Sequence, residues 1–224
     1  MSAVQCQCTP ECRSPVLPGM SFCAYHRQQC FRRAPLTGYE PDYKPEKYNR
    51  SKRIRESHNC FAYAFDHMDI PSLKECSDTS CPVPFHQPGR KSGYPKWNAV
   101  KGKRCPDLIA RLRADIHGIQ TTTFTRKCPK GTSKIALVVD PHEDYHFYRQ
   151  DSNGYWSHKP GAMPVTNLDA QGRLIYDPAI ASRKYANKSG STLNYTEFCS
   201  YLCAPRNKPL RFKRGGATRK RRRD

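Results

Sequence analysis

The stretch DYHFYRQDSNGYWSHKPG, residues 144–161, constrains the fold more strongly than any other part of the chain. Apolar and polar residues alternate on both sides of Asn153-Gly154, which is typical of two antiparallel strands joined by a tight turn. Because the side chains of a strand alternate between its two faces, the length of this turn decides which residues share a face.

Two turn lengths are compatible with the sequence. A three-residue loop that ends at Gly154 places Tyr148 opposite His158. His146 and His158 then lie on one face as diagonal neighbours, within reach of each other. A two-residue turn would instead point His158 to the other face.

The two-residue alternative changes the polar partner of His146. With His158 turned away, Asp151 or Gln150 would be needed to orient the ring of His146. Both alternatives keep a histidine at the start of the outgoing strand. The sequence alone leaves this choice open.

A cysteine at the predicted start of a helix is the second feature that indicates chemistry. In NCFAYAFDHMD, residues 59–69, apolar residues recur with helical spacing, and Ser57 or Asn59 can cap the start of the helix. The amides of a helix N-terminus favour a thiolate at Cys60 and also form an oxyanion hole. A nucleophilic thiol needs a base and a group that orients it, for which His146, His158 and Asp151 are the candidates. The alternative is that Cys60 is a small core residue and the histidines are ordinary strand residues.

The remaining patterns predict an α+β domain over residues 58–205. A second helix is expected over CPDLIARLRADI, residues 105–116, whose proline suits a first helical turn. KIALVVD (134–140) and RLIYD (173–177) are expected to add strands to the hairpin. TLNYTEFCSYLC (192–203) is expected to be a closing helix, so that helices pack on a meander of strands.

Residues 1–30 are expected to form a small zinc-binding module. Four potential ligands have the spacing C-x3-C-x10-C-x2-H around a turn-rich loop: Cys8, Cys12, Cys23 and His26. Two such close pairs can bind zinc tetrahedrally, and the metal would supply most of the folding free energy, about 10 kcal/mol or more. The pattern is similar to short zinc knuckles. Cys6 or Cys30 could replace one ligand, and reduced thiols without a metal are the alternative.

The other two segments are a linker and a basic tail. Residues 31–57 mix prolines, tyrosines and charges without a clear period, as expected of a strap on a domain surface. Residues 206–224 contain ten Lys or Arg and one Asp, and so carry nine of the net charge of +20. This tail is expected to be disordered and to bind a polyanion such as nucleic acid, or to act as a nuclear-import signal. A solubilising end is the alternative.

The chain contains twelve cysteines, whose meaning depends on the compartment. Its first residues lack the apolar stretch of a signal peptide, and no run approaches the ~18 apolar residues of a membrane span. We therefore expect the cytoplasm or nucleus, or packaging in a virion. Cys76 and Cys81 are expected to be buried or to hold a second metal with His86. Four others are expected to be buried thiols: Cys105, Cys128, Cys199 and Cys203.

Residues 58–205 resemble the NlpC-type branch of papain-like cysteine peptidases. HNCFAYAFD corresponds to the nucleophile helix, and DYHFYRQDSNGYWSHKPG to the hairpin that carries the base and the third residue. The resemblance implies a nucleophile helix packed on an antiparallel sheet, with Cys60 as nucleophile, His146 as general base and His158 as orienting residue. The same stretch also resembles uncharacterised proteins of large DNA viruses and bacteria.

Two hypotheses from different functional classes follow. The first is a thiol hydrolase that cleaves an amide bond in a protein or peptide-like substrate: a peptide, an isopeptide or a cell-wall stem peptide. The second is a non-catalytic structural or nucleic-acid-associated protein, such as a virion component, in which the papain-like domain is a packing module. Only the first requires Cys60 to lie within reach of a histidine beside an open cleft.

Overall fold

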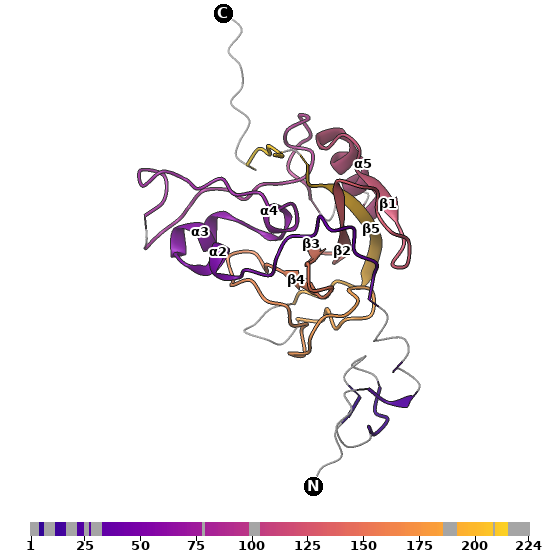
Figure 1. Ribbon diagram of the computed structural model, residues 1–224. Coiled ribbons are helices and arrows are strands. Elements are labelled where there is room, and N and C mark those ends of the chain that lie inside the picture. Colours follow the sequence, from indigo (N-terminus) through magenta and orange to yellow (C-terminus); the bar gives the residue numbers. More distant parts are fainter. Residues whose placement is uncertain are drawn as a thin grey trace, which may run out of the picture.

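The computed structural model describes residues 5–6, 12–16, 22–24, 27, 33–77, 79–98, 104–185, 192–207 and 209–214. Its centre is a five-stranded antiparallel sheet in the order β1-β5-β2-β3-β4 (Figure 1). The strands are β1 (Gln120–Thr122), β2 (Thr132–Val139), β3 (Tyr145–Gln150), β4 (Trp156–His158) and β5 (Glu197–Pro205).

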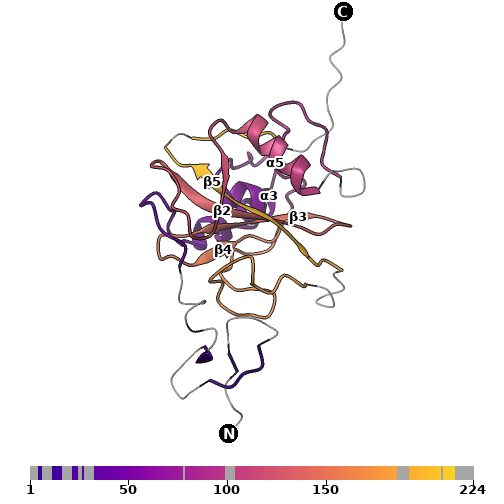
Figure 2. The same cartoon turned by 90° about the vertical axis from the view of Figure 1, so that its right-hand side faces the viewer.

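The described residues also form four named helices: α2 (Glu46–Asn49), α3 (Lys52–Ser57), α4 (Cys60–Ala64) and α5 (Arg104–Asp115). The expected α+β class is confirmed, and α5 lies where CPDLIARLRADI predicts a helix. Figures 1 and 2 show α5 and the orange segment 159–185 on opposite sides of the sheet. None of the described helices is long and apolar enough to cross a membrane.

The two faces of the sheet carry two apolar clusters. Ile135, Leu137 and Val139 of β2 are fully buried against α4 and α5. The intervening Ala136 and Val138 are equally buried on the opposite face, beneath the segments that follow β4. A strand covered on both faces is a continuous apolar run, which explains the sequence KIALVVD.

The helix α4 begins where the sequence predicts. The Asn59 Oδ1 accepts a hydrogen bond from the Ala62 amide at 3.2 Å, so Asn59 is the N-cap. All residues of α4 are buried, and the Phe61 ring packs against aromatic rings from β3 and the C-terminal segment. The helix is shorter than expected because the chain leaves it after Ala64, and Asp66 has a positive φ of 52°.

The hairpin of β3 and β4 has the three-residue loop. Tyr148 lies opposite His158, and the Asp151 amide donates to the Tyr155 carbonyl at 2.9 Å. Gly154 has a φ of 83°, the left-handed conformation expected of it. The register predicted for the longer loop is confirmed, and His146 and His158 share a face.

Two predicted elements are wrong. Residues 192–203 do not form a closing helix, because β5 lies between β1 and β2. In this position Leu202 packs toward the helices and Tyr201 toward the opposite face, so burial on both sides overrides the helical spacing of the apolar residues. Residues 173–177 contribute an isolated bridge instead of a strand.

Six cysteines that were expected to be reduced form disulfides: Cys76–Cys81, Cys105–Cys199 and Cys128–Cys203. The last two connect β5 to α5 and to the loop before β2. The prediction of buried thiols is therefore wrong, as is the metal site at Cys76 and Cys81. Partners that are 94 and 75 residues apart cannot be paired from sequence alone. Three disulfides are typical of proteins from an oxidising compartment.

The segment 33–57 lies against the hairpin. The Arg33 guanidinium donates to the Asn153 carbonyl at 2.9 Å, and the Gln150 side chain donates to the Ala34 carbonyl at 2.7 Å. These contacts join the described part of the segment to the hairpin. The helices α2 and α3 within it were not predicted, because prolines and charges obscure their short apolar pattern.

The start of the basic tail packs onto the domain. Phe212 is buried beside α4, and Arg214 donates to the Ser57 and Asp69 carbonyls at 2.7 Å each. Residues 215–224 lie outside the described residues. Disorder and polyanion binding in that part stay predictions.

Replacement of Cys128 and Cys203 by alanine should lower the free energy of unfolding by about 4 kcal/mol, because their disulfide closes a long loop in the unfolded chain. The matched variant without Cys76 and Cys81, which are five residues apart, should lose only about 2 kcal/mol. Urea denaturation measures both losses. Equal losses would show that loop closure does not determine the effect.

Candidate functional site

Cys60 and His146 line one cavity of about 530 Å³. Cys60 is the first residue of α4, and His146 is the second residue of β3. Trp97, Asp144 and Gln87 contribute to the same cavity. A larger cavity of about 710 Å³ lies beyond the other end of α4 and contains neither the cysteine nor the histidine. Of these two cavities, the smaller one is therefore the candidate site for the reaction predicted for Cys60 and His146.

His146 and His158 form a direct hydrogen bond. The His146 Nε2 lies 2.8 Å from the His158 Nδ1, and the His158 Nε2 lies 3.0 Å from the Leu168 carbonyl oxygen. A carbonyl oxygen only accepts, so the His158 Nε2 carries the proton and donates it. In the neutral ring the Nδ1 of His158 is then an acceptor, and the His146 Nε2 must donate to it.

This chain of hydrogen bonds leaves the Nδ1 of His146 with a lone pair. No hydrogen bond within the described residues occupies that nitrogen. Burial and the neighbouring His158 ring lower the pKa of His146 well below its usual value. Burial also lowers the pKa of His158 to about 4. Both rings are therefore neutral near pH 7, and His146 can accept a proton at Nδ1.

The Cys60 thiol is held in its protonated form. Burial, followed by the charge of Asp144, raises its pKa to about 12. The helix α4 has only five residues, so its dipole offsets little of this cost. The Cys60 thiol is therefore neutral near pH 7, whereas the sequence predicts a thiolate.

The sulfur and the His146 ring share the cavity without a mutual hydrogen bond. The Cys60 Sγ instead donates to the Tyr145 carbonyl at 4.0 Å. Cys60 packs in the cluster on the α4 side of the sheet. The His146 ring contacts Tyr148 and Tyr195 on the opposite side, with centroids 5.1 and 5.3 Å away. The two side chains therefore pack on opposite faces of the sheet, although both residues line the cavity at the start of β3.

Asp151 does not lie beside His146. Its buried carboxylate accepts from the Arg149 Nε at 2.9 Å. Arg149 also forms an ion pair with Asp66 at 3.2 Å and lies 3.9 Å above the Tyr63 ring. His158 is thus the residue that contacts the candidate base, and Asp151 belongs to a network that connects the hairpin to α4.

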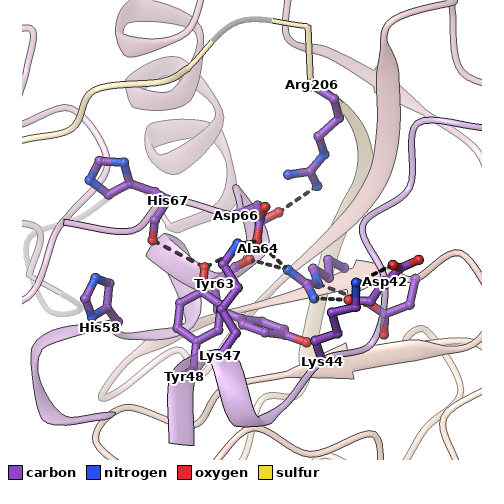
Figure 3. Close-up of polar contacts among 12 residues, drawn as sticks. Asp42, Lys44, Lys47, Tyr48, His58, Tyr63, Ala64, Asp66, His67 and Arg206 are labelled. Atoms are coloured by element: carbon purple, nitrogen blue, oxygen red, sulfur yellow. Dashed lines mark hydrogen bonds and ion pairs between the residues drawn. The ribbon is translucent and has the colours of Figure 1, made fainter. Parts of the chain in front are cut away.

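The end of α4 is fixed by further polar contacts. Lys47 pairs with Asp66 at 2.8 Å, and Arg206 donates to the Ala64 carbonyl at 2.7 Å. Figure 3 shows these residues at the end of α4. The Tyr63 hydroxyl lies 2.6 Å from the Ser157 hydroxyl of β4. These contacts hold α4 in a fixed position relative to the hairpin of β3 and β4.

Asp144 is a residue of this cavity that the sequence did not indicate. Burial raises its pKa to about 6, and the Tyr195 hydroxyl donates to it at 3.4 Å. The only sequence signal is its place directly before the strand that carries His146. Its carboxyl group lines the cavity, where it can contact a donor of a substrate.

The N-terminal thiols converge as a possible metal-binding group. The sulfurs of Cys6, Cys12 and Cys23 lie within 4.8 Å of one another, and those of Cys12 and Cys23 are 3.6 Å apart. Cys8 and His26, the other two predicted ligands, lie outside the described residues. Cys6 was named as an alternative ligand and is part of the group.

One curated protein resembles the chain over most of its length. The chain is 38% identical over 141 residues to the insoluble matrix shell protein 1 of Ruditapes philippinarum. The alignment covers 63% of this chain and 80% of that protein. No family model matches the chain. No solved structure matches it either.

The His158 pKa predicts a loss of stability in acid. Because the pKa falls from its usual 6.5 to about 4 on folding, the unfolded chain binds a proton at higher pH than the folded protein. This contribution is complete above pH 6.5 and is lost as the pH falls toward 4, by up to about 3 kcal/mol. The free energy of unfolding of His158→Gln should therefore decline less steeply than that of the unmodified protein as the pH falls.

Urea unfolding between pH 7 and pH 4 measures this decline. His117→Gln, at an exposed histidine, is the matched control and should keep the slope of the unmodified protein. An unchanged slope in His158→Gln would mean that this ring is not held neutral.

Proposed function

The chain belongs to the family of insoluble matrix shell protein 1, and from that premise we propose that it is a cysteine hydrolase that acts on amide bonds of protein or peptide material in a matrix. One observation carries the proposal: His158 orients the His146 ring and leaves its Nδ1 available, and His146 and Cys60 line one cavity. A helix-borne cysteine and a histidine hairpin are also what the NlpC-type papain-like resemblance implies.

The proposed reaction uses both neutral groups. As the Cys60 sulfur attacks the substrate carbonyl carbon, its proton passes to the Nδ1 of His146. The resulting imidazolium keeps its hydrogen bond to the His158 Nδ1, and the first-turn amides of α4 stabilise the oxyanion. His146 then returns the proton to the leaving amine, and water hydrolyses the thioester. Cys60 must first leave the Tyr145 carbonyl to approach the ring.

Three disulfides and the shell-matrix relative favour a second candidate, a structural matrix component. The raised pKa of Cys60 agrees with it, since a protonated thiol is a weak nucleophile. Under either candidate function, the disulfides favour an oxidising compartment. The intracellular or virion location and the nucleic-acid partner stay predictions.

We also propose that the N-terminal module binds structural zinc. Support comes from the convergence of Cys6, Cys12 and Cys23, to which Cys8 or His26 could add a fourth ligand. Three cysteines and one further ligand are a common tetrahedral zinc set. The Phe22 ring contacts Tyr176 at 5.1 Å, so the module would be anchored to the main domain.

A cleavage assay with labelled peptides, isopeptide conjugates and cell-wall stem peptides tests the hydrolase. Cys60→Ala should abolish cleavage, and His146→Ala should reduce it by about 10²–10⁴-fold because proton transfer is lost. His117→Ala, at an exposed histidine, is the matched control for His146→Ala and should remain active. Product formation by mass spectrometry is the readout.

The structural candidate makes the opposite prediction. It predicts no cleavage by any variant and slow alkylation of Cys60 by iodoacetamide, because the buried thiol stays protonated. Cleavage that persists in Cys60→Ala would exclude this cysteine as the nucleophile.

A further inference from the structure

Three potential ligands converge just beyond the C-terminal end of α4. His67, Asp69 and His86 each offer one ligand atom, and these atoms lie within 4.8 Å of one another. The His86 Nε2 is 3.4 Å from the Asp69 Oδ2. This group is separate from the N-terminal thiols and from the cavity that contains Cys60.

The His86 ring is buried without hydrogen bonds. His86 is 0% exposed, and neither ring nitrogen has a hydrogen-bond partner within the described residues. A buried polar group without a partner costs about 1–3 kcal/mol. Such a group therefore needs an explanation. Its edge-on contact with the His67 ring, with centroids 4.7 Å apart, supplies no partner for the nitrogens.

His67 is oriented as a metal ligand would be. Its Nδ1 donates to the Leu210 carbonyl at 3.0 Å, so the proton is on Nδ1 and the lone pair is on Nε2. The Nε2 is buried and has no hydrogen-bond partner in the described part of the chain. A histidine ligand typically fixes its tautomer in this way, by donating its other nitrogen to a carbonyl group. In Figure 3 the His67 ring points away from the ion pairs of Asp66.

An ion pair between His86 and Asp69 does not account for the cluster. The His86 Nε2 and the Asp69 Oδ2 are 3.4 Å apart and make no hydrogen bond, so the Nε2 stays without a partner among the described residues. The positive charge beside Asp69 comes from Arg214, whose Nη2 is 3.7 Å from the Asp69 Oδ2. Arg214 is held mainly by the carbonyls of Ser57 and Asp69, which leaves the carboxylate available to another cation.

We propose that His67, Asp69 and His86 bind a divalent transition-metal ion, and Zn²⁺ in particular. Two imidazole nitrogens and one carboxylate oxygen suit zinc, whereas calcium and magnesium select oxygen ligands. Three protein ligands leave a fourth position open. His67 and Asp69 line the cavity of about 710 Å³, so that position faces a space that admits water or a small ligand.

The metal site also borders the cavity of Cys60. His86 lies between Phe85 and Gln87, which both line that cavity, and its carbonyl accepts from the Asn59 side chain at 3.0 Å. An ion at His86 would therefore stabilise the wall beside the first residue of α4. Metal binding itself does not depend on the proposed hydrolase.

Cobalt binding to the full chain tests the site, with the N-terminal thiols replaced by serine at Cys6, Cys8, Cys12 and Cys23. One equivalent of Co²⁺ should bind with visible ligand-field absorption and without the charge-transfer band of a thiolate. Zn²⁺ should displace it. Failure of this variant to bind either ion would overturn the proposal.

Substitution of the proposed ligands, in the protein whose four N-terminal cysteines are replaced by serine, gives a second test through the affinity for Zn²⁺. Asp69→Asn, at an exposed side chain, should weaken Zn²⁺ binding by at least about tenfold. His86→Phe should abolish it, and His117→Phe, at an exposed histidine, should leave it unchanged. Unchanged affinity in Asp69→Asn and His86→Phe would contradict the assignment.

Discussion

The register of the β3 and β4 hairpin governs the candidate site. A shift of one residue would turn His158 to the other face and break both its hydrogen bond to His146 and its hydrogen bond to the Leu168 carbonyl. The loop that sets this register requires a positive φ at Gly154, where a Cβ atom would also lie 2.9 Å from the Arg33 side chain. The strap and the turn therefore maintain the tautomers on which the chemistry of His146 depends.

The short helix α4 connects two sites of different chemistry. At its first residue the thiol shares a cavity with His146, and beyond its last residue His67 and Asp69 meet the buried ring of His86. Burial keeps the Cys60 thiol and the His146 and His158 rings uncharged. A domain cross-linked by disulfides and held by such a network suits both functions that we propose, a hydrolase and a structural matrix component.

Local signals account for the parts that the sequence predicted. The Asn59 cap defines the start of α4, and the Asn153-Gly154 turn with its alternating flanks defines the hairpin register. The position of β5 in the sheet and the pairing of its cysteines depend on segments far away in the sequence. The helical spacing of apolar residues in 192–203 therefore led to a wrong prediction of a helix. The sequence also did not indicate the proposed metal-binding group. His67 and Asp69, with the spacing H-x-D, are a weak signal until the fold brings His86 beside them.

Nitrogen-15 NMR of the histidine side chains at pH 7 tests the central claim most directly. The hydrogen-bond chain predicts that His146 and His158 are both neutral and both protonated at Nε2, with His146 Nδ1 unprotonated. Substitution of each histidine by glutamine assigns the signals. A His146 ring that is protonated at Nδ1, or charged at pH 7, would contradict the account, because no lone pair would then be available to take the proton of Cys60.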